Sequence, residues 1–141
     1  MIKFSRLSQI EHGDYPFEDA VTKEDTFNGA FGDVADGEFT VGANKKKAIM
    51  QLEVGDDEYM PTYKIAKGSH VRVLDFEKVN GQLMEVYGDE VPAEAVKGSK
   101  LESDTDGTLK VNESATAPYY EVTRIIGNKL GVEVKVVASA E

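Results

Sequence analysis

The sequence predicts a mainly β fold: a small barrel or sandwich of short antiparallel strands, with an extended N-terminal arm and at most one or two short helices. Three observations support this prediction. From residue 48 onward, apolar and polar residues alternate with a period of two, which is typical of half-buried strands. The 13 glycines fall largely between these alternating segments, where turns are expected. Helical periodicity is weak along the whole chain.

Residues 1–20 are predicted to form the arm, and residues 21–141 a single β-rich domain. Before Phe27 the chain has little alternating apolar pattern, so it offers little core of its own. Phe4, Ile10 and Phe17 are spaced through the arm and are candidate anchors on a partner. The residues alone leave a second interpretation open, in which the arm is simply a flexible or packed terminus.

Two hairpins are predicted within the domain. Asn80-Gly81 favours a type I′ turn between strands at residues 70–76 and 83–86, because both residues tolerate positive φ angles. Gly127-Asn128 turns a strand at residues 119–126 into one at residues 132–136, where three valines alternate with Glu133 and Lys135. Short helices are predicted at residues 91–96 and 17–23.

A loose pattern recurs three times, as a glycine turn, a short strand, a second glycine turn and a returning strand. The glycine pairs that bracket the short strands are Gly29 and Gly37, Gly68 and Gly81, and Gly98 and Gly107. Hairpins in any small barrel share this pattern, and a family-specific arrangement is the alternative.

Composition excludes several function classes. Sixteen Lys and Arg against 26 Asp and Glu give a net charge of −10, which argues against a nucleic-acid binder that depends on neutralising phosphates. The chain has no Cys and two His, so thiol chemistry and disulfides are excluded and His-rich metal sites nearly so. No apolar run exceeds three residues, so neither a membrane span nor a signal-peptide core is predicted.

The acidic residues are concentrated in one part of the chain. Residues 11–60 hold 13 acids and four bases, for −9, whereas residues 1–10 carry +2. This stretch either keeps an exposed surface soluble or complements basic groups on a partner. The only basic run, Lys45-Lys46-Lys47, is predicted to be a solvated loop, with contact to an acidic patch or a phosphate as the alternative.

Residues 102–113 are a weak candidate for a calcium loop. Oxygen donors stand at positions 1, 3, 5 and 12 of the twelve, with Gly107 at position 6. The donors are Glu102, Asp104, Asp106 and Glu113. Glu in place of Asp at the first position, and flanks that are not helical, favour a solvated hairpin instead. No phosphate-binding glycine loop or nucleophile–base motif is present, so neither an enzyme nor a cofactor is predicted.

Several segments resemble the capsid decoration, or cement, proteins of tailed bacteriophages. The first is Ala-Val-Thr-Lys-Glu-Asp-Thr-Phe-Asn-Gly-Ala-Phe at residues 20–31. Lys-Gly-Ser at residues 67–69 and again at 97–99 resembles the family's later strand starts, and Asp-Gly-Thr-Leu at residues 106–109 its hairpin. The stretch at residues 45–63 and the N-terminal arm have no counterpart in this resemblance.

The resemblance implies a structural virion protein, made in the host cytoplasm and located on the capsid exterior. It would bind the major capsid protein at junctions between subunits and reinforce the head, and a homotrimer is compatible with the resemblance. Nucleic acid and membrane are not implied as partners. The alternative is a non-enzymatic β-rich binding module for a protein or a glycan, associated with a tail or fibre, and a calcium-binding module is the lesser third.

Overall fold

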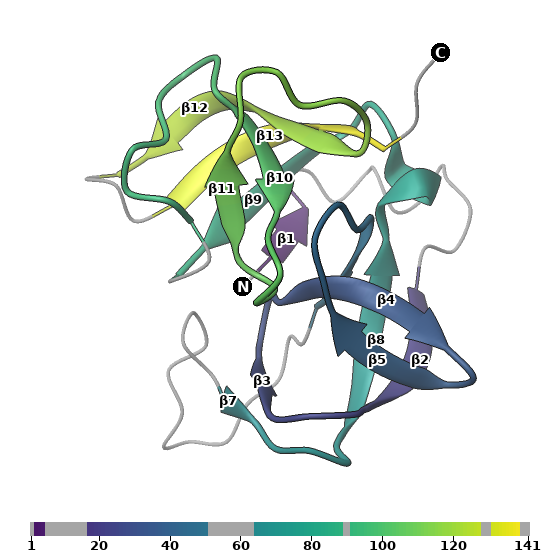
Figure 1. Ribbon diagram of the computed structural model, residues 1–141. Helices are drawn as coiled ribbons and strands as arrows, with labels where there is room; N and C mark the ends of the chain where they lie inside the picture. The colour runs from purple at the N-terminus through teal and green to yellow at the C-terminus, as the bar shows by residue number, and fades with distance from the viewer. Residues whose placement is uncertain (1, 5–16, 51–63, 89–90, 128–130, 139–141) are drawn as a thin grey trace.

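The chain folds into two β bodies, a closed five-stranded barrel and an open six-stranded sheet (Figure 1). This computed structural model describes residues 2–4, 17–50, 64–88, 91–127 and 131–138, with only the backbone at residues 3 and 4. The prediction of a mainly β fold is confirmed. In the described part of the chain the one helix is the 3₁₀ turn η2 (Phe76–Val79), and no helix there is long and apolar enough to cross a membrane.

The barrel is formed by strands from the first 75 residues, in the order β2-β5-β4-β6-β8. Their bounds are β2 (Phe17–Thr22), β4 (Phe31–Ala35), β5 (Glu38–Val41), β6 (Lys47–Ile49) and β8 (His70–Asp75). An odd number of strands cannot close with alternating directions, so one neighbouring pair must be parallel. That pair is β2 and β5, where Val21 lies opposite Glu38. The other four pairs are antiparallel.

The sheet takes its strands from both ends of the chain, in the order β1-β9-β13-β12-β10-β11, all antiparallel. Their bounds are β1 (Ile2–Phe4), β9 (Leu83–Tyr87), β10 (Lys100–Ser103), β11 (Leu109–Val111), β12 (Tyr119–Ile126) and β13 (Gly131–Val137). A small separate pair joins β3 (Thr26–Phe27) to β7 (Lys64–Ile65). The N-terminal strand β1 therefore completes a sheet that is otherwise made of residues 83–137.

The two bodies share a hydrophobic core. The barrel has its own small interior, and a larger cluster joins barrel residues such as Phe31 and Leu74 to the inner face of the sheet. At the centre of this cluster three buried rings meet: Phe31 from β4, Phe76 from η2 and Tyr120 from β12. Their centroids lie 5.0–5.5 Å apart, in the range of favourable aromatic pairs. Packing at this junction fixes the barrel against the sheet.

The same type of glycine turn precedes four strands. The glycines of these turns are Gly29, Gly68, Gly81 and Gly98. Each glycine has a φ between +82° and +97° and is the third residue of a turn closed by an i to i+3 hydrogen bond. The glycine N–H then donates to one residue of a neighbouring strand, whose own N–H donates to the carbonyl of the residue after the glycine. Two residues therefore face one, which defines a glycine β-bulge. A strand follows two positions after each glycine.

The recurring pattern is confirmed for two of its three units. The Asp36-Gly37 turn, with positive φ at both residues, joins β4 to β5 as a type I′ hairpin. A turn at residues 104–107 likewise joins β10 to β11. The hairpin between β12 and β13 is also confirmed, with Val132, Val134 and Val136 buried.

The predicted Asn80-Gly81 hairpin is wrong. Strand β8 belongs to the barrel and β9 to the sheet, so the turn does not pair the strands that flank it. Asn80 has φ −54° and ψ 133°, which with the positive φ of Gly81 makes a type II turn. The reason is η2, whose buried Phe76 and Val79 carry the chain from one body to the other.

Both predicted helices are also wrong. Residues 17–22 form the barrel strand β2, in which tertiary pairing to β8 and β5 overrides a weak local pattern. Residues 91–96 form turns, with Ala95 buried in the main core. Pro92 and the glycine turn at Gly98 leave too few residues between them for a stable helix.

Candidate functional site

The predicted anchors at residues 1–20 are only in part available to a partner. The backbone of Phe4 is paired with Met84 in the sheet, next to a fully buried Ile2. Phe17 is half-buried in β2, where the Arg72 guanidinium lies 4.3 Å from its ring centroid. Ile10 lies outside the described residues. The ends of the predicted arm are therefore strands of the protein itself, which corrects the prediction of one continuous arm.

The four calcium candidates do not converge on one point. Glu102 is 8% exposed, and its Oε1 accepts a hydrogen bond from Asn112 Nδ2 at 3.0 Å. Asp104 Oδ1 accepts from the Thr105 N–H at 2.7 Å. No group of three or more acidic or histidine side chains that could hold a metal ion occurs in the described residues, which include all four candidates. The calcium hypothesis is not supported.

Local hydrogen bonding accounts for Asp106, and Glu113, the fourth candidate, is exposed. Asp106 accepts from both the N–H and the hydroxyl of Thr108, at 3.0 and 2.6 Å, and these bonds lower the pKa of Asp106. Lys110 lies 3.8 Å from Glu102 and 3.7 Å from Asp104. The loop is a three-residue hairpin connection ending in Gly107 at φ +86°, a common turn that needs no metal.

The basic run at residues 45–47 joins elements of the fold and is not a solvated loop. Lys46 Nζ lies 2.8 Å from Glu77, and Lys47 Nζ lies 2.7 Å from Glu18. Burial works to lower the pKa of Lys47, but the bond to Glu18 and nearby carboxylates outweigh it, so the pKa is raised. The Lys45 carbonyl accepts from the buried Tyr120 hydroxyl at 3.2 Å. The ammonium groups of Lys46 and Lys47 thus have carboxylate partners within the protein, and Lys45 contributes its backbone carbonyl.

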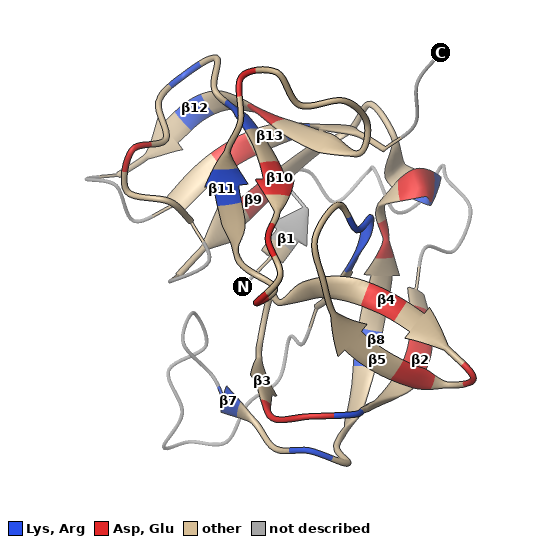
Figure 2. Cartoon of the chain, in the orientation of Figure 1, with Lys and Arg blue, Asp and Glu red and all other residues tan. Residues whose placement is uncertain are grey.

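The barrel carries carboxylates along β2, β4 and β5 and at the turn between β4 and β5 (Figure 2). These exposed or half-buried side chains are Glu18, Asp19, Asp33, Asp36 and Glu38. Lys47 contacts two of them, Glu18 and Asp33, at 2.7 and 3.9 Å. These carboxylates belong to the acidic stretch at residues 11–60 and make up part of it.

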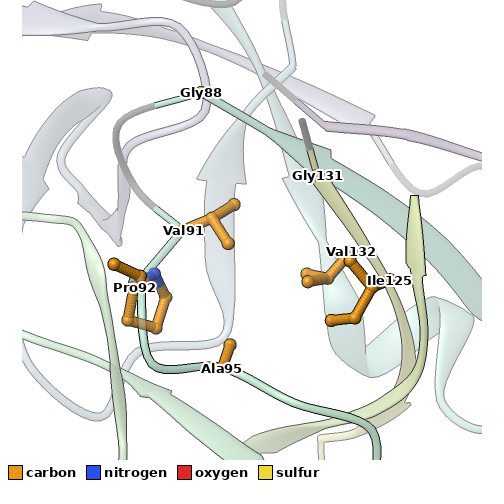
Figure 3. Close-up of a pocket in the computed structure, with 8 residues that line it drawn as sticks. Gly88, Val91, Pro92, Ala95, Ile125, Gly131 and Val132 are labelled. Atoms are coloured by element: carbon orange, nitrogen blue, oxygen red, sulfur yellow. The ribbon is translucent and has the colours of Figure 1, made fainter. Parts of the chain in front are cut away.

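A small apolar cavity lies between Gly88 and residues 91–95 on one side and the ends of β12 and β13 on the other. Figure 3 shows Val91, Pro92 and Ala95 on one side of it, facing Ile125 and Val132 on the other. Its volume is about 60 Å³. Ligand sites usually measure roughly 300–1,000 Å³, so this cavity accommodates no more than a small apolar group.

A larger groove of about 570 Å³ lies at the opposite end of β12 and β13. Its lining residues are Asn80, Gly81, Lys100, Ala115, Thr116, Ala117, Tyr119, Lys135, Val136 and Val137. They come from the Gly81 turn, the segment before β12, and strands β10, β12 and β13. This volume falls within the range of ligand sites. We call it the β12–β13 groove.

Two lysines lie in this groove, and among the described residues no carboxylate lines it. Lys100 Nζ lies 5.1 Å from the ring centroid of Tyr119, a cation–π contact that restricts the position of the ammonium group. Glu121 of β12 is paired with Lys100 of β10 on one side and with Lys135 of β13 on the other. Because directly paired residues point to the same face of a sheet, both lysines lie on the outer face.

The sequence did not predict this groove. Alternation along residues 132–136 does place Lys135 outward, and the Gly98 turn marks the start of the strand that carries Lys100. Their proximity depends on β10 and β13 both pairing with β12, and pairing of strands cannot be derived from local pattern alone. No signal in the sequence connects the two lysines.

A second polar cluster lies on the same outer face, around Glu133. Thr123 Oγ1 donates to Glu133 Oε1 at 2.9 Å, and Arg124 Nε lies 3.3 Å from Glu133 Oε2. In the neighbouring strand the Tyr87 hydroxyl donates to Glu85. Burial first, and the bond to Glu85 second, raise the pKa of Tyr87 to about 12. These contacts bind the carboxylates within the sheet.

A scan against protein-family models and a search of curated proteins both found no match.

Proposed function

We propose that the protein is a non-catalytic structural component of a tailed-phage virion. It binds the outer surface of the assembled capsid at junctions between major capsid subunits and stabilises the head. The proposal starts from the segments of the sequence that resemble capsid decoration proteins. Those segments are the glycine turns at Gly29, Gly68 and Gly98 and the hairpin at Gly107.

The observation that carries the proposal is the shared role of these segments in one rigid body. The three turns form the same hydrogen-bonded bulge, and Phe31 N–H donates to the Gly107 carbonyl at 2.8 Å, which connects the sheet hairpin to the barrel. A protein that reinforces a shell under internal pressure has to hold its own geometry when loaded. Barrel and sheet share one core, so the body supports such a role.

The proposal is tested by adding the purified protein to assembled capsids that lack it. Co-sedimentation with capsids, saturating at a fixed number of copies per shell, is expected, together with greater resistance of the shells to heat. Unassembled capsid subunits serve as the control, because a junction between subunits exists only in the shell. If the protein binds capsids no better than it binds an unrelated protein lattice, the proposed function is wrong.

A further inference from the structure

We propose that the β12–β13 groove binds an acidic, partly apolar segment of a protein partner. The proposal rests on the proposed function only for the identity of that partner, which would then be the major capsid protein. The groove itself is defined by geometry and charge in the described residues.

The charge of the groove is opposite to that of the chain. The protein has a net charge of −10, yet the described residues that line the groove include Lys100 and Lys135 and no acid. Glu121 lies between the two lysines in the strand register but is not among the lining residues. The groove therefore offers two ammonium groups, and carboxylates are the side chains that complement them.

The shape of the groove favours a segment of polypeptide over a small anion. Val137, Ala117 and Tyr119 are half-buried and expose apolar surface beside the two charges, whereas Val136 and Ala115 are buried and expose almost none. An inorganic anion would use the ammonium groups and leave this surface and most of the volume unfilled. A segment with apolar side chains beside its carboxylates uses both.

The strand register also sets the spacing of the charges. Lys100 and Lys135 are on strands that flank β12, so their backbones lie two strand spacings apart, about 10 Å. Residues two apart in an extended segment point the same way and are separated by roughly 7 Å, a spacing that flexible Lys and Glu side chains can bridge. The expected ligand therefore has two carboxylates two positions apart, with an apolar residue two positions before or after them on the same face.

The direct test uses the synthetic hexapeptide Leu-Ser-Glu-Ser-Glu-Ser, which when extended presents one Leu and two Glu on the same face. It is titrated into ¹⁵N-labelled protein and followed by NMR, and in the control peptide both Glu are replaced by Lys. Saturable shifts are expected at Lys100, Tyr119 and Lys135, and the control peptide is expected to cause none. The double variant Lys100→Glu/Lys135→Glu is expected to bind the acidic peptide at least about tenfold more weakly. The matched control, Lys67→Glu/Lys97→Glu, makes the same charge change at two exposed turn positions outside the groove.

The outcomes separate the groove from the proposed function. No saturable shift, shifts outside the groove, or equal binding by the two double variants overturns the groove proposal. Co-sedimentation of the same variants with capsids gives the second readout. Loss of capsid binding in the groove variant alone supports both proposals, and equal capsid binding by the two variants overturns the groove as the capsid contact. If the peptide binds the groove and the unaltered protein does not bind capsids, the groove stands and the proposed function fails.

Discussion

The barrel and the sheet differ in how they close. The barrel closes on itself with strands drawn from residues 17–75, and the parallel pairing of β2 with β5 completes the ring. The sheet has two edges, β1 and β11, and one of them is supplied from the opposite end of the chain. The barrel thus depends on neighbouring strands, whereas the sheet depends on residues that are remote in sequence. The two bodies are stabilised together because they share one core.

The largest effect is expected from breaking the junction between the two bodies. Phe31→Ala removes the ring that contacts both Phe76 and Tyr120, and a buried Phe-to-Ala change usually costs about 3–5 kcal/mol. Urea unfolding followed by far-UV circular dichroism and by tyrosine fluorescence measures the loss. The two probes are expected to give one coincident transition. Separate transitions for barrel and sheet would contradict the shared core.

The second-largest loss of stability is expected at Ile2, and it tests whether the N-terminus is a strand of the sheet or a free arm. Ile2→Ala is expected to reduce the free energy of unfolding by about 2–5 kcal/mol, because Ile2 is fully buried in the main core. Ile49→Ala, at an equally buried site inside the barrel, is the matched comparison. A loss at Ile2 below about 0.5 kcal/mol, as at an exposed position, would restore the arm interpretation.

Substitutions at two glycines are expected to show how tightly the hairpin between β10 and β11 packs against the barrel. Gly68 and Gly107 both have positive φ angles, of +82° and +86°. A Cβ at Gly68 would meet nothing within 4 Å, whereas at Gly107 it would lie 2.9 Å from Val41 of the barrel. Gly68→Ala is expected to cost about 1–2 kcal/mol from backbone strain, and Gly107→Ala about 1–3 kcal/mol more from crowding. If urea unfolding shows the same loss of unfolding free energy for both variants, the neighbouring Val41 side chain moves aside without an energetic penalty.

A smaller effect is expected at high pH. The pKa of Tyr87 is raised from 10.0 to about 12, so the neutral phenol favours the folded state. Its contribution is fully present below pH 10 and is lost as the pH rises through 12. Absorbance titration at 295 nm is expected to show a late tyrosine ionisation that Tyr87→Phe removes. Because the variant has one tyrosine fewer, a loss of absorbance change near pH 10 with the late ionisation kept would contradict the bond to Glu85.

The smallest effect is expected from calcium. Because Glu102, Asp104 and Asp106 are held by Lys110, Asn112 and neighbouring backbone groups, millimolar calcium is expected to leave the melting temperature unchanged. Scanning calorimetry with and without calcium measures this, with magnesium as the control. A rise specific to calcium would revive the loop hypothesis.

The sequence predicted what depends on short-range pattern. Alternation and glycine turns were sufficient for the β class and for the hairpin of β12 and β13. Asn80-Gly81 shows the limit, because the same dipeptide suits a hairpin or the type II turn that is found. Choosing between them requires the pairing of β9 with β1 and β13, which is long-range.

Candidate sites were predicted less well than the fold. The acidic spacing at residues 102–113 resembled a calcium loop, but a spacing does not show where side chains point. Glu102 points to Lys110 and Asn112 across a hairpin, a contact set by strand register. The β12–β13 groove was missed for the same reason, since its two lysines are 35 positions apart and meet only through β12.

The pairing of β1 with β9 also imposes an order in time. Ile2 lies opposite Val86, so the partner of the first strand is synthesised 84 positions later. At ribosomal rates of about 5–20 residues per second, that delay is roughly 4–17 s. During this delay the barrel strands have been synthesised and can pair with one another. Ile2, which is apolar, has no partner strand until β9 has been made. The protein is therefore expected to form its barrel before its sheet, because the last barrel strand ends at Asp75 and every sheet strand except β1 lies beyond residue 82.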